Sequence, residues 1–283
     1  SFWYYGAGIS FVPTNVFPSI VSDKGISYLK TTLNYTKTGN DPGLYSTEGT
    51  FSAPGNFPYG SITGLSQSST VPAPDLNPEF TTSIEAGIEI GLFKNRLRGE
   101  FAAYKTNSTD QIIPVQTSFA SGATSNIVNV GEIQNLGLEV GLNGTVLRSE
   151  DFSWDLGVNW SPIKTEVISL TDGLDELVIA NPAASVSVVA KVGEPYPQLR
   201  TTAYLLDDQG RTIVGANGDP IADANNQVQG KTTPDYTLGM NTNIRYKNWS
   251  LYVVGDYRTG HVFYNNLVDA IEFTGLSKHS ASS

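Results

Sequence analysis

Residues 83–93 read SIEAGIEIGLF, and this stretch decides the fold class. Every second residue from Ile84 to Leu92 is apolar, and the alternate positions from Ser83 to Gly91 hold serine, glutamate or glycine. An alternation of period two places the two sets on opposite faces of an extended strand. A long strand with one wholly apolar face predicts either the wall of a membrane barrel or one layer of a soluble sandwich.

The same alternation recurs along the chain. Clear copies cover residues 136–147, 152–161 and 236–246, and a less regular copy covers 249–258. Weaker copies cover 2–12, 26–38 and 97–104. Together these windows predict an all-β, antiparallel sheet of about eight strands.

The connections between these strands alternate between short and long. Residues 93–96, 148–151 and 246–249 are tight turns, and only residues 13–25 make a longer connection on that side. On the other side the connecting and terminal segments are 39–80, 110–130, 165–234 and 260–283. Outer-membrane barrels have short turns at one rim and long extracellular loops at the other. We therefore expect residues 1–283 to be part of a transmembrane β-barrel, with those four segments as its extracellular loops.

Side chains at the short-turn rim are of the kinds expected at the boundary of a bilayer. Aromatic residues with a polar edge settle at membrane boundaries, where Lys and Arg can remain hydrated. The residues of these two kinds at this rim are Phe93, Phe152, Trp154, Tyr246 and Trp249, with Lys94, Arg96, Arg148 and Lys247. A soluble β-sandwich also alternates, but its strands are usually shorter and its exposed edges richer in lysine.

Composition excludes several functions. A net charge of -10 with only 17 Lys and Arg argues against a nucleic-acid partner. The chain has no cysteine, which excludes disulfides and thiolate chemistry. Residues 177–190, the longest uncharged apolar-rich run, contain Pro182 and are too short for a membrane-spanning helix. The only histidines, His261 and His279, lie near the end without a Ser-His-Asp spacing, so we predict no enzyme.

A specific motif stands at residues 129–140, which read NVGEIQNLGLEV. It resembles the N-x-G-E-x-x-N-x-G-x-E pattern of the late barrel in SusC/RagA-like TonB-dependent receptors. Further segments follow the order of that family: SYLKTTLNYTKTGND from Ser27, NPEFTTSIEAGIEIGLFKNRLRGEFAAY from Asn77, DFSWDLGVNWS from Asp151, VGEPYPQLR from Val192 and TPDYTLGMNTNIRYKNWSL from Thr233. Only residues 42–74 lack a family signature.

This resemblance implies a 22-stranded barrel in the outer membrane of a Gram-negative, Bacteroidetes-type bacterium. It also implies a plug domain that couples to TonB, a SusD-like surface lipoprotein as partner, and active import of oligosaccharides or oligopeptides. The plug, the TonB box and the final strands are not among residues 1–283, and open sheet edges are costly in lipid. We therefore expect a longer native polypeptide. Alternatives are a passive porin, an anchoring barrel, or a soluble carbohydrate-binding β-sandwich.

The polar face of the strands supplies one set of candidate residues. We expect it to line the lumen or to contact the plug, with cross-strand ion pairs such as Arg98 with Glu89 as the structural alternative. Glu85 and Glu89 lie about 13 Å apart along one strand, too far for glycosidic acid-base chemistry. The predicted lumen-lining residues are Glu85, Glu89, Arg98, Glu100, Glu139, Asp155, Asn159, Asn241, Arg245, Asp256 and Arg258.

The long loops supply two further sets. Loop aromatics can stack on sugars or grip peptide side chains, although each could equally pack within its loop or against the lipoprotein. These substrate-binding candidates are Tyr45, Phe51, Phe57, Tyr59, Phe119, Tyr196 and Tyr204. Calcium prefers oxygen ligands such as those of Asn217, Asp219, Asp223 and Asn225, but turn chemistry explains these residues equally well. We expect no other cofactor.

Overall fold

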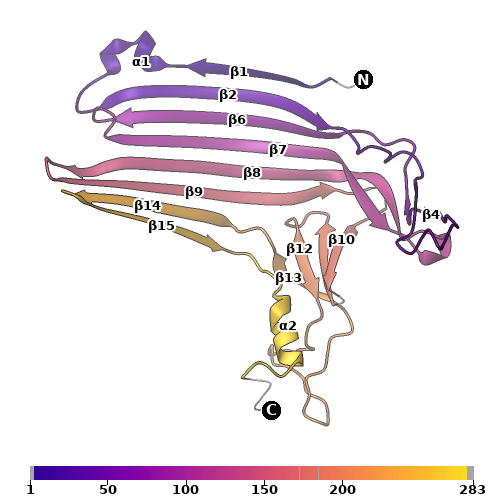
Figure 1. The fold of residues 1–283 in the computed structure, drawn as a ribbon. Helices are drawn as coiled ribbons and strands as arrows, with labels where there is room; N and C mark the ends of the chain where they lie inside the picture. Colours follow the sequence, from indigo (N-terminus) through magenta and orange to yellow (C-terminus); the bar gives the residue numbers. More distant parts are fainter. Residues whose placement is uncertain (1–2, 172, 184, 279–283) are drawn as a thin grey trace.

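A computed structural model describes residues 3–171, 173–183 and 185–278 (Figure 1). Eight long strands form one antiparallel sheet in the order β1-β2-β6-β7-β8-β9-β14-β15. They are β1 (Tyr5–Phe11), β2 (Ile26–Asn40), β6 (Glu79–Leu92), β7 (Leu97–Gln116), β8 (Ser125–Arg148), β9 (Phe152–Ser169), β14 (Tyr236–Tyr246) and β15 (Trp249–Thr259). The predicted antiparallel barrel segment is confirmed. The strands make an open arc in which each pairs with its neighbour in the chain, not two stacked layers, which excludes the β-sandwich.

The register sorts side chains onto two different faces. Residues opposite one another share a face, as Ile88 does with Phe101 and Phe101 with Val140. The apolar face is open: Ile88 is 47% exposed and Met240 49%. A continuous uncovered apolar surface of this extent belongs against another apolar phase. Lipid supplies that phase, so this face is the outside of the barrel.

Aromatic residues mark both ends of the apolar face. At the long-loop rim, rings pair as Tyr5 with Tyr35 (centroids 6.1 Å apart) and as Tyr236 with Trp160 and Tyr257 (6.4 and 6.3 Å). At the other rim, Tyr246 pairs in register with Trp249. From Tyr236 to Tyr246 the strand rises about 33 Å, which at a barrel tilt of about 40° spans about 25 Å. That height matches the apolar band of an outer-membrane barrel.

The short-turn rim contains the expected tight connections. In the β6–β7 turn Phe93, Lys94 and Asn95 all have positive φ, between 55° and 60°. The longer connection between β1 and β2 contains a short helix α1 (Pro13–Val16) and a 3-10 turn η1 (Pro18–Ile20). Among the described residues, no helix is both long and apolar enough to cross a membrane.

The predicted loop 110–130 is much shorter in the structure. Pairing of β7 with β8 continues from Gln111 opposite Val130 to Gln116 opposite Ser125. The alternation is interrupted where Asp110 (φ 56°) and Gly131 (φ 67°) bend the two strands. The sequence pattern is therefore lost at the bend, while the hydrogen-bonded ladder continues beyond it.

The predicted loop 165–234 is also more ordered than expected. β9 continues to Ser169, and a separate antiparallel sheet follows, formed by β10 (Glu176–Ala183), β11 (Val186–Lys191), β12 (Gln198–Thr201) and β13 (Gln227–Lys231). Its core joins Leu177 and Ala190 to Val130 and Val167 of the long strands. Short buried runs such as residues 186–190 predict a strand only when their length and β-branched content are weighed, because they do not alternate.

Smaller elements decorate the same rim. Residues 41–78 contain a hairpin of β3 (Phe51–Ser52) and β4 (Ser66–Gln67), and β5 (Thr70–Val71) pairs parallel with β8. Beyond β12, three short segments around Leu205, Ile213 and Ile221, called here the ring of three legs, are joined by backbone hydrogen bonds. Leu205 N donates to Ile221 O (2.8 Å), Ile221 N to Ile213 O (2.9 Å) and Ile213 N to Leu205 O (2.9 Å). Helix α2 (Asn266–Phe273) follows β15. In Figure 1 the four-stranded sheet, α2 and the chain beyond β12 project from the long-loop end of the arc.

Candidate functional site

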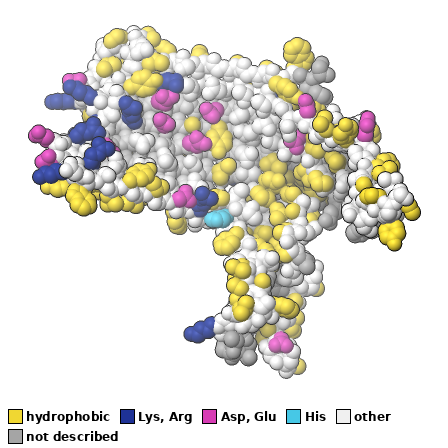
Figure 2. Space-filling model, viewed as in Figure 1, with side chains coloured by type: hydrophobic (Ala, Val, Ile, Leu, Met, Phe, Trp, Pro, Cys, Tyr) yellow, Lys and Arg dark blue, Asp and Glu magenta, His cyan; other side chains and the backbone are white. Residues whose placement is uncertain are grey.

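A continuous row of polar-face residues crosses the sheet. In register it runs Lys30, Glu89, Glu100, Gly141, Asn159, Gly239 and Asp256. The period of two puts Glu85 on the same face of β6 as Glu89, and Glu139 on the same face of β8 as Gly141. Figure 2 looks onto this face, where carboxylates lie over the strands and Lys and Arg gather toward the short-turn rim.

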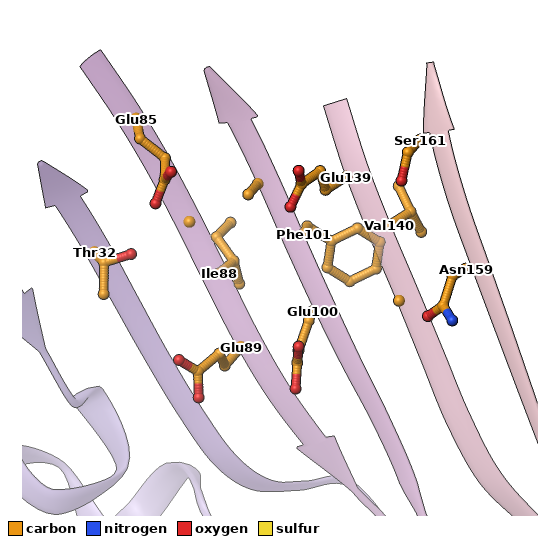
Figure 3. A pocket seen from close by; sticks show the side chains of 13 residues that line it. Thr32, Glu85, Ile88, Glu89, Glu100, Phe101, Glu139, Val140, Asn159 and Ser161 are labelled. Carbon is orange, nitrogen blue, oxygen red and sulfur yellow. The ribbon is translucent and has the colours of Figure 1, made fainter. Parts of the chain in front are cut away.

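The carboxylates line a depression of about 440 Å³ (Figure 3). Its polar lining comes from five adjacent strands: Thr32, Glu85, Glu89, Glu100, Glu139, Asn159 and Ser161. Gly87 and Gly141 contribute no side chain there, which keeps the floor open. Of the predicted lumen-lining residues, the structure therefore brings together Glu85, Glu89, Glu100, Glu139 and Asn159.

The depression carries an excess of negative charge. Glu89 and Glu100 stand directly opposite one another, an arrangement that like charges disfavour. Lys30 offsets part of this repulsion, since its Nζ lies 2.6 Å from Glu89 Oε1. The proposed pair of Arg98 with Glu89 was wrong. The register places Arg98 opposite Gly91, and Lys30 takes the carboxylate of Glu89 instead.

The remaining polar-face candidates lie outside this depression. Arg98 lines a neighbouring hollow of about 320 Å³ with Glu89 and Glu100. Asp155 accepts a hydrogen bond from Thr145 (2.6 Å) and lies 3.5 Å from Arg148. Asp256 and Arg258 pair with each other at 2.8 Å, Asn241 lies opposite Gly157, and Arg245 lies opposite Ser153.

The motif at residues 129–140 holds the bend of β7 and β8. The Asn129 side chain accepts a hydrogen bond from Asn77 N (2.8 Å) and donates to the carbonyls of Asn77 (2.8 Å) and Asp110 (2.7 Å). Asn129 thus ties the end of the 41–78 segment to the bent strand. At Gly131 a Cβ would lie 2.3 Å from Ser169 O, and the positive φ independently favours glycine.

The later motif positions join neighbouring strands. Glu132 accepts a hydrogen bond from Asn107, and Asn135 accepts one from Thr165 (2.7 Å). Gly137 lies under the ring of Tyr104, which a Cβ would approach to 2.4 Å. Glu139, the last motif residue, enters the carboxylate depression. The motif therefore secures β7, β8 and β9 to one another and places one carboxylate in the depression.

Comparison with known proteins agrees with this architecture. The family description "TonB dependent receptor-like, beta-barrel" matches residues 1–257. The chain belongs to this family. The predicted SusC/RagA-like resemblance is confirmed, and proteins of this family are outer-membrane receptors and transporters, not enzymes.

Several relatives of this TonB-dependent receptor barrel are known. "TonB-dependent receptor P3" of Formosa agariphila is 27% identical over 62% of the chain and 20% of its own length. "TonB-dependent receptor SusC" of Bacteroides thetaiotaomicron is 26% identical over 74% of the chain and 22% of its own length. In the "Structure of the RagAB peptide transporter" the matching chain is 26% identical, with a TM-score of 0.75 over 93% of this chain and 30% of that one. The chain thus spans about a fifth of the length of these curated relatives.

The loop aromatics of this receptor barrel are distributed over several elements. Tyr45, Phe51 and Tyr59 are exposed on the 41–78 segment, where the ring of Phe57 lies close to Gly64. Tyr204 is exposed on the ring of three legs. Phe119 begins the short 3-10 helix η2 (Phe119–Ser121), but its side chain lies outside the described part of the structure.

Tyr196 differs from the other loop aromatics. It packs against the cluster of Val130, Val167, Leu177 and Ala190, and burial raises the pKa of its hydroxyl. Its ring is used in holding the four-stranded sheet against the barrel strands. Packing therefore explains Tyr196 better than substrate contact.

The calcium candidates form two turns of the receptor loop. Asn217 donates a hydrogen bond to Asp219 within one turn. In the other, Asp223 accepts hydrogen bonds from Asn225 N (2.9 Å) and from the Gln227 side chain (2.6 Å). Within residues 3–171, 173–183 and 185–278, no group of three or more His, Cys, Asp or Glu is placed to hold a metal ion. The geometry favours turn chemistry for these four residues.

Sequence reasoning missed two features of this site. Lys30 and Thr32 lie in a weakly alternating strand, so nothing marked them as neighbours of the carboxylates before the register was known. The hydrogen bonds of Asn129 could not be foreseen either, because they join segments far apart in the chain. In the sequence, the motif at residues 129–140 was the signal that pointed to this part of the sheet.

Proposed function

We propose that this chain forms part of the wall of an outer-membrane importer driven through TonB, which takes up oligosaccharides or oligopeptides. The observation that supports this proposal most directly is that the open sheet has two different faces. Its outer face is apolar and bounded by aromatic residues, and its inner face is polar with a cluster of carboxylates. The resemblance to SusC and to the RagAB transporter supports the same role. The relatives' sources favour a Bacteroidetes-type bacterium.

The carboxylate depression is proposed to face the plug domain. Four glutamates with Lys30 as the one basic residue in ion-pair contact leave the surface electronegative, in the part of the sheet that the structure describes. A plug surface bearing Lys or Arg would complement it. The predicted lumen-lining residues that lie beyond the depression, from Arg98 to Arg258, are proposed to share this role on the same face.

The projecting elements at the long-loop rim are proposed to bind a SusD-like lipoprotein. They expose large apolar side chains on the ring of three legs and around α2: Tyr204, Leu206, Val214, Phe263, Leu267, Phe273 and Leu276. Apolar patches on extracellular segments are typical of protein interfaces. The exposed aromatics Tyr45, Phe51 and Tyr59 are proposed to contact substrate, with Phe57 and Phe119 as further candidates.

Uptake by the full-length receptor tests the main proposal. Cells would be given labelled oligosaccharides or oligopeptides, with TonB present or deleted. We expect uptake of one substrate class that is lost without TonB. Uptake that is independent of TonB would identify a passive porin, and release of the protein from membranes by high salt and carbonate would contradict the barrel.

A further inference from the structure

A groove of about 630 Å³ opens on the lipid-facing side of β7, β8 and β9, next to the short-turn rim. Its walls are apolar: Phe93, Leu97, Leu142, Val146, Leu156 and Val158. The volume lies within the range of ligand-binding pockets. A further apolar hollow of about 530 Å³ lies on the same face around Ile88, Phe101 and Val140, but the groove at the rim has Arg96 in its lining.

Glycine produces the groove. Gly144 lies directly between Leu97 on β7 and Leu156 on β9, so the row of outward side chains is interrupted on the middle strand. Gly144 does not have positive φ, so its backbone does not require glycine. A Cβ at Gly144 would come within 3.2 Å of Leu97 Cδ1, so the Leu97 side chain leans over the glycine, and the groove runs along Leu97 and Leu156.

A cation closes one end of the groove. Arg96 Nε donates to Thr145 O (2.8 Å) and Nη2 donates to Val146 O (2.6 Å), which fixes the guanidinium beside the apolar walls. No carboxylate lies within ion-pair distance of Arg96 among the described residues, whereas nearby Lys94 is paired with Asp23 at 2.9 Å. The remaining guanidinium N–H donors suit a phosphate.

We propose that this groove binds one phospholipid of the inner leaflet, with an acyl chain between Leu97 and Leu156 and the phosphate at Arg96. The short-turn rim of an outer-membrane barrel faces the periplasm, so the head groups at this height belong to that leaflet. Apolar walls beside a cation that has no carboxylate partner in the described part of the chain match the chemistry of a phospholipid at the membrane boundary. The site rests on the barrel lying in a membrane, not on what it imports.

The position of the groove excludes other occupants. β7, β8 and β9 each pair with strands on both sides, so further barrel strands can add only at the β1 and β15 edges. A plug would lie on the opposite, polar face. Lipid is what remains to fill the groove.

Native mass spectrometry of the full-length receptor in detergent tests the site, with phosphatidylglycerol and with diacylglycerol of the same chains. We expect phosphatidylglycerol to bind at least tenfold more tightly than diacylglycerol. Gly144→Leu fills the groove and should weaken both lipids at least tenfold. Arg96→Gln should reduce phosphatidylglycerol to the level of diacylglycerol, and Arg96→Lys should retain the preference.

Matched controls lie on the same face and rim. Gly255→Leu adds the same side chain at an outward-facing position of β15, opposite Met240. Lys247→Gln removes a cation from the turn between β14 and β15. Both variants should bind lipid as the wild type does. Equal binding of the two lipids, or Gly144→Leu binding like the wild type, would overturn the proposal. If Gly144→Leu fails to fold, the comparison of the two lipids and the Arg96→Gln and Arg96→Lys variants still test the lipid site. Normal TonB-driven uptake without selective lipid binding would overturn the lipid site and leave the proposed function standing.

Discussion

Two glycines of the barrel strands stand where a side chain would clash with a neighbouring strand. Gly131 combines a left-handed φ with a carbonyl where its side chain would be, and Gly137 gives way to the ring of Tyr104. Both belong to the motif by which the sequence resembles the SusC/RagA-like family. The motif thus has a steric explanation at these positions, independent of any ligand.

Gly131→Ala in the full-length receptor is expected to destabilise the barrel by roughly 2 kcal/mol or more, because a strained φ is combined with a backbone clash. Urea unfolding in phospholipid vesicles measures this change. Gly141→Ala on the same strand is the control, since its Cβ would make only ordinary van der Waals contacts, with Asn159 Oδ1 at 3.5 Å and Glu100 Cβ at 3.8 Å. Equal stability of the two variants would contradict the steric explanation.

Elements at the long-loop rim are held by local hydrogen bonds. In the ring of three legs, Asp207 accepts from Arg211 N and Gln209 N (both 2.9 Å) and from Arg211 Nε (2.8 Å). Asp223 performs the same role after the third leg. Each turn therefore depends on a charged carboxylate.

The turn at Asp207 is expected to loosen in acid. Hydrogen bonds from the backbone and side chain of Arg211, with a smaller contribution from Gln209, hold the pKa of Asp207 below its ordinary value. The stabilisation is complete above the unfolded-state pKa of about 3.9 and is lost as the pH falls through the lowered folded-state pKa. Amide exchange of residues 203–215, corrected for intrinsic rates, should show this loss. Asp207→Asn should remove the pH dependence, and pH-independent protection in the wild type would refute the mechanism.

The two faces of the barrel sheet are suited to two different environments, lipid outside and a polar interior. Its outer face carries aliphatic residues between two aromatic girdles, and its inner face carries the carboxylate depression. The strands between these faces are held by a regular antiparallel ladder from β1 to β15. Function is therefore proposed at the inner face and at the long-loop rim, while the outer face meets lipid.

The double substitution Glu100→Gln with Glu139→Gln is expected to lower TonB-dependent uptake about tenfold, equivalent to roughly 1.4 kcal/mol of lost interaction with a cationic plug surface. Uptake at equal surface expression is the measurement. Glu150→Gln, in the turn between β8 and β9, removes a carboxylate outside the depression and serves as control. Uptake equal to that of the wild type would place the plug contacts elsewhere.

The sequence alone predicted the eight strands and their order, because alternation and turn length are local properties of residues such as those at 83–93. It also predicted which face is polar. It failed where the pattern is not local: β7 and β8 continue past the bend at Asp110 and Gly131, and residues 176–231 contain a separate four-stranded sheet with short, non-alternating buried runs such as 186–190.

Only the tertiary structure decided which charges meet. Ion pairing depends on register: on β7 Glu100, not Arg98, lies opposite Glu89, and on the other side of β6 Lys30 of β2 lies opposite Glu89 and pairs with it. The far aromatic girdle and the Gly144 groove likewise arise from residues on adjacent strands that are distant in the chain. The stretch at 83–93 fixed the kind of wall that forms, because periodicity acts within one strand, whereas the sites on that wall needed the pairing between strands.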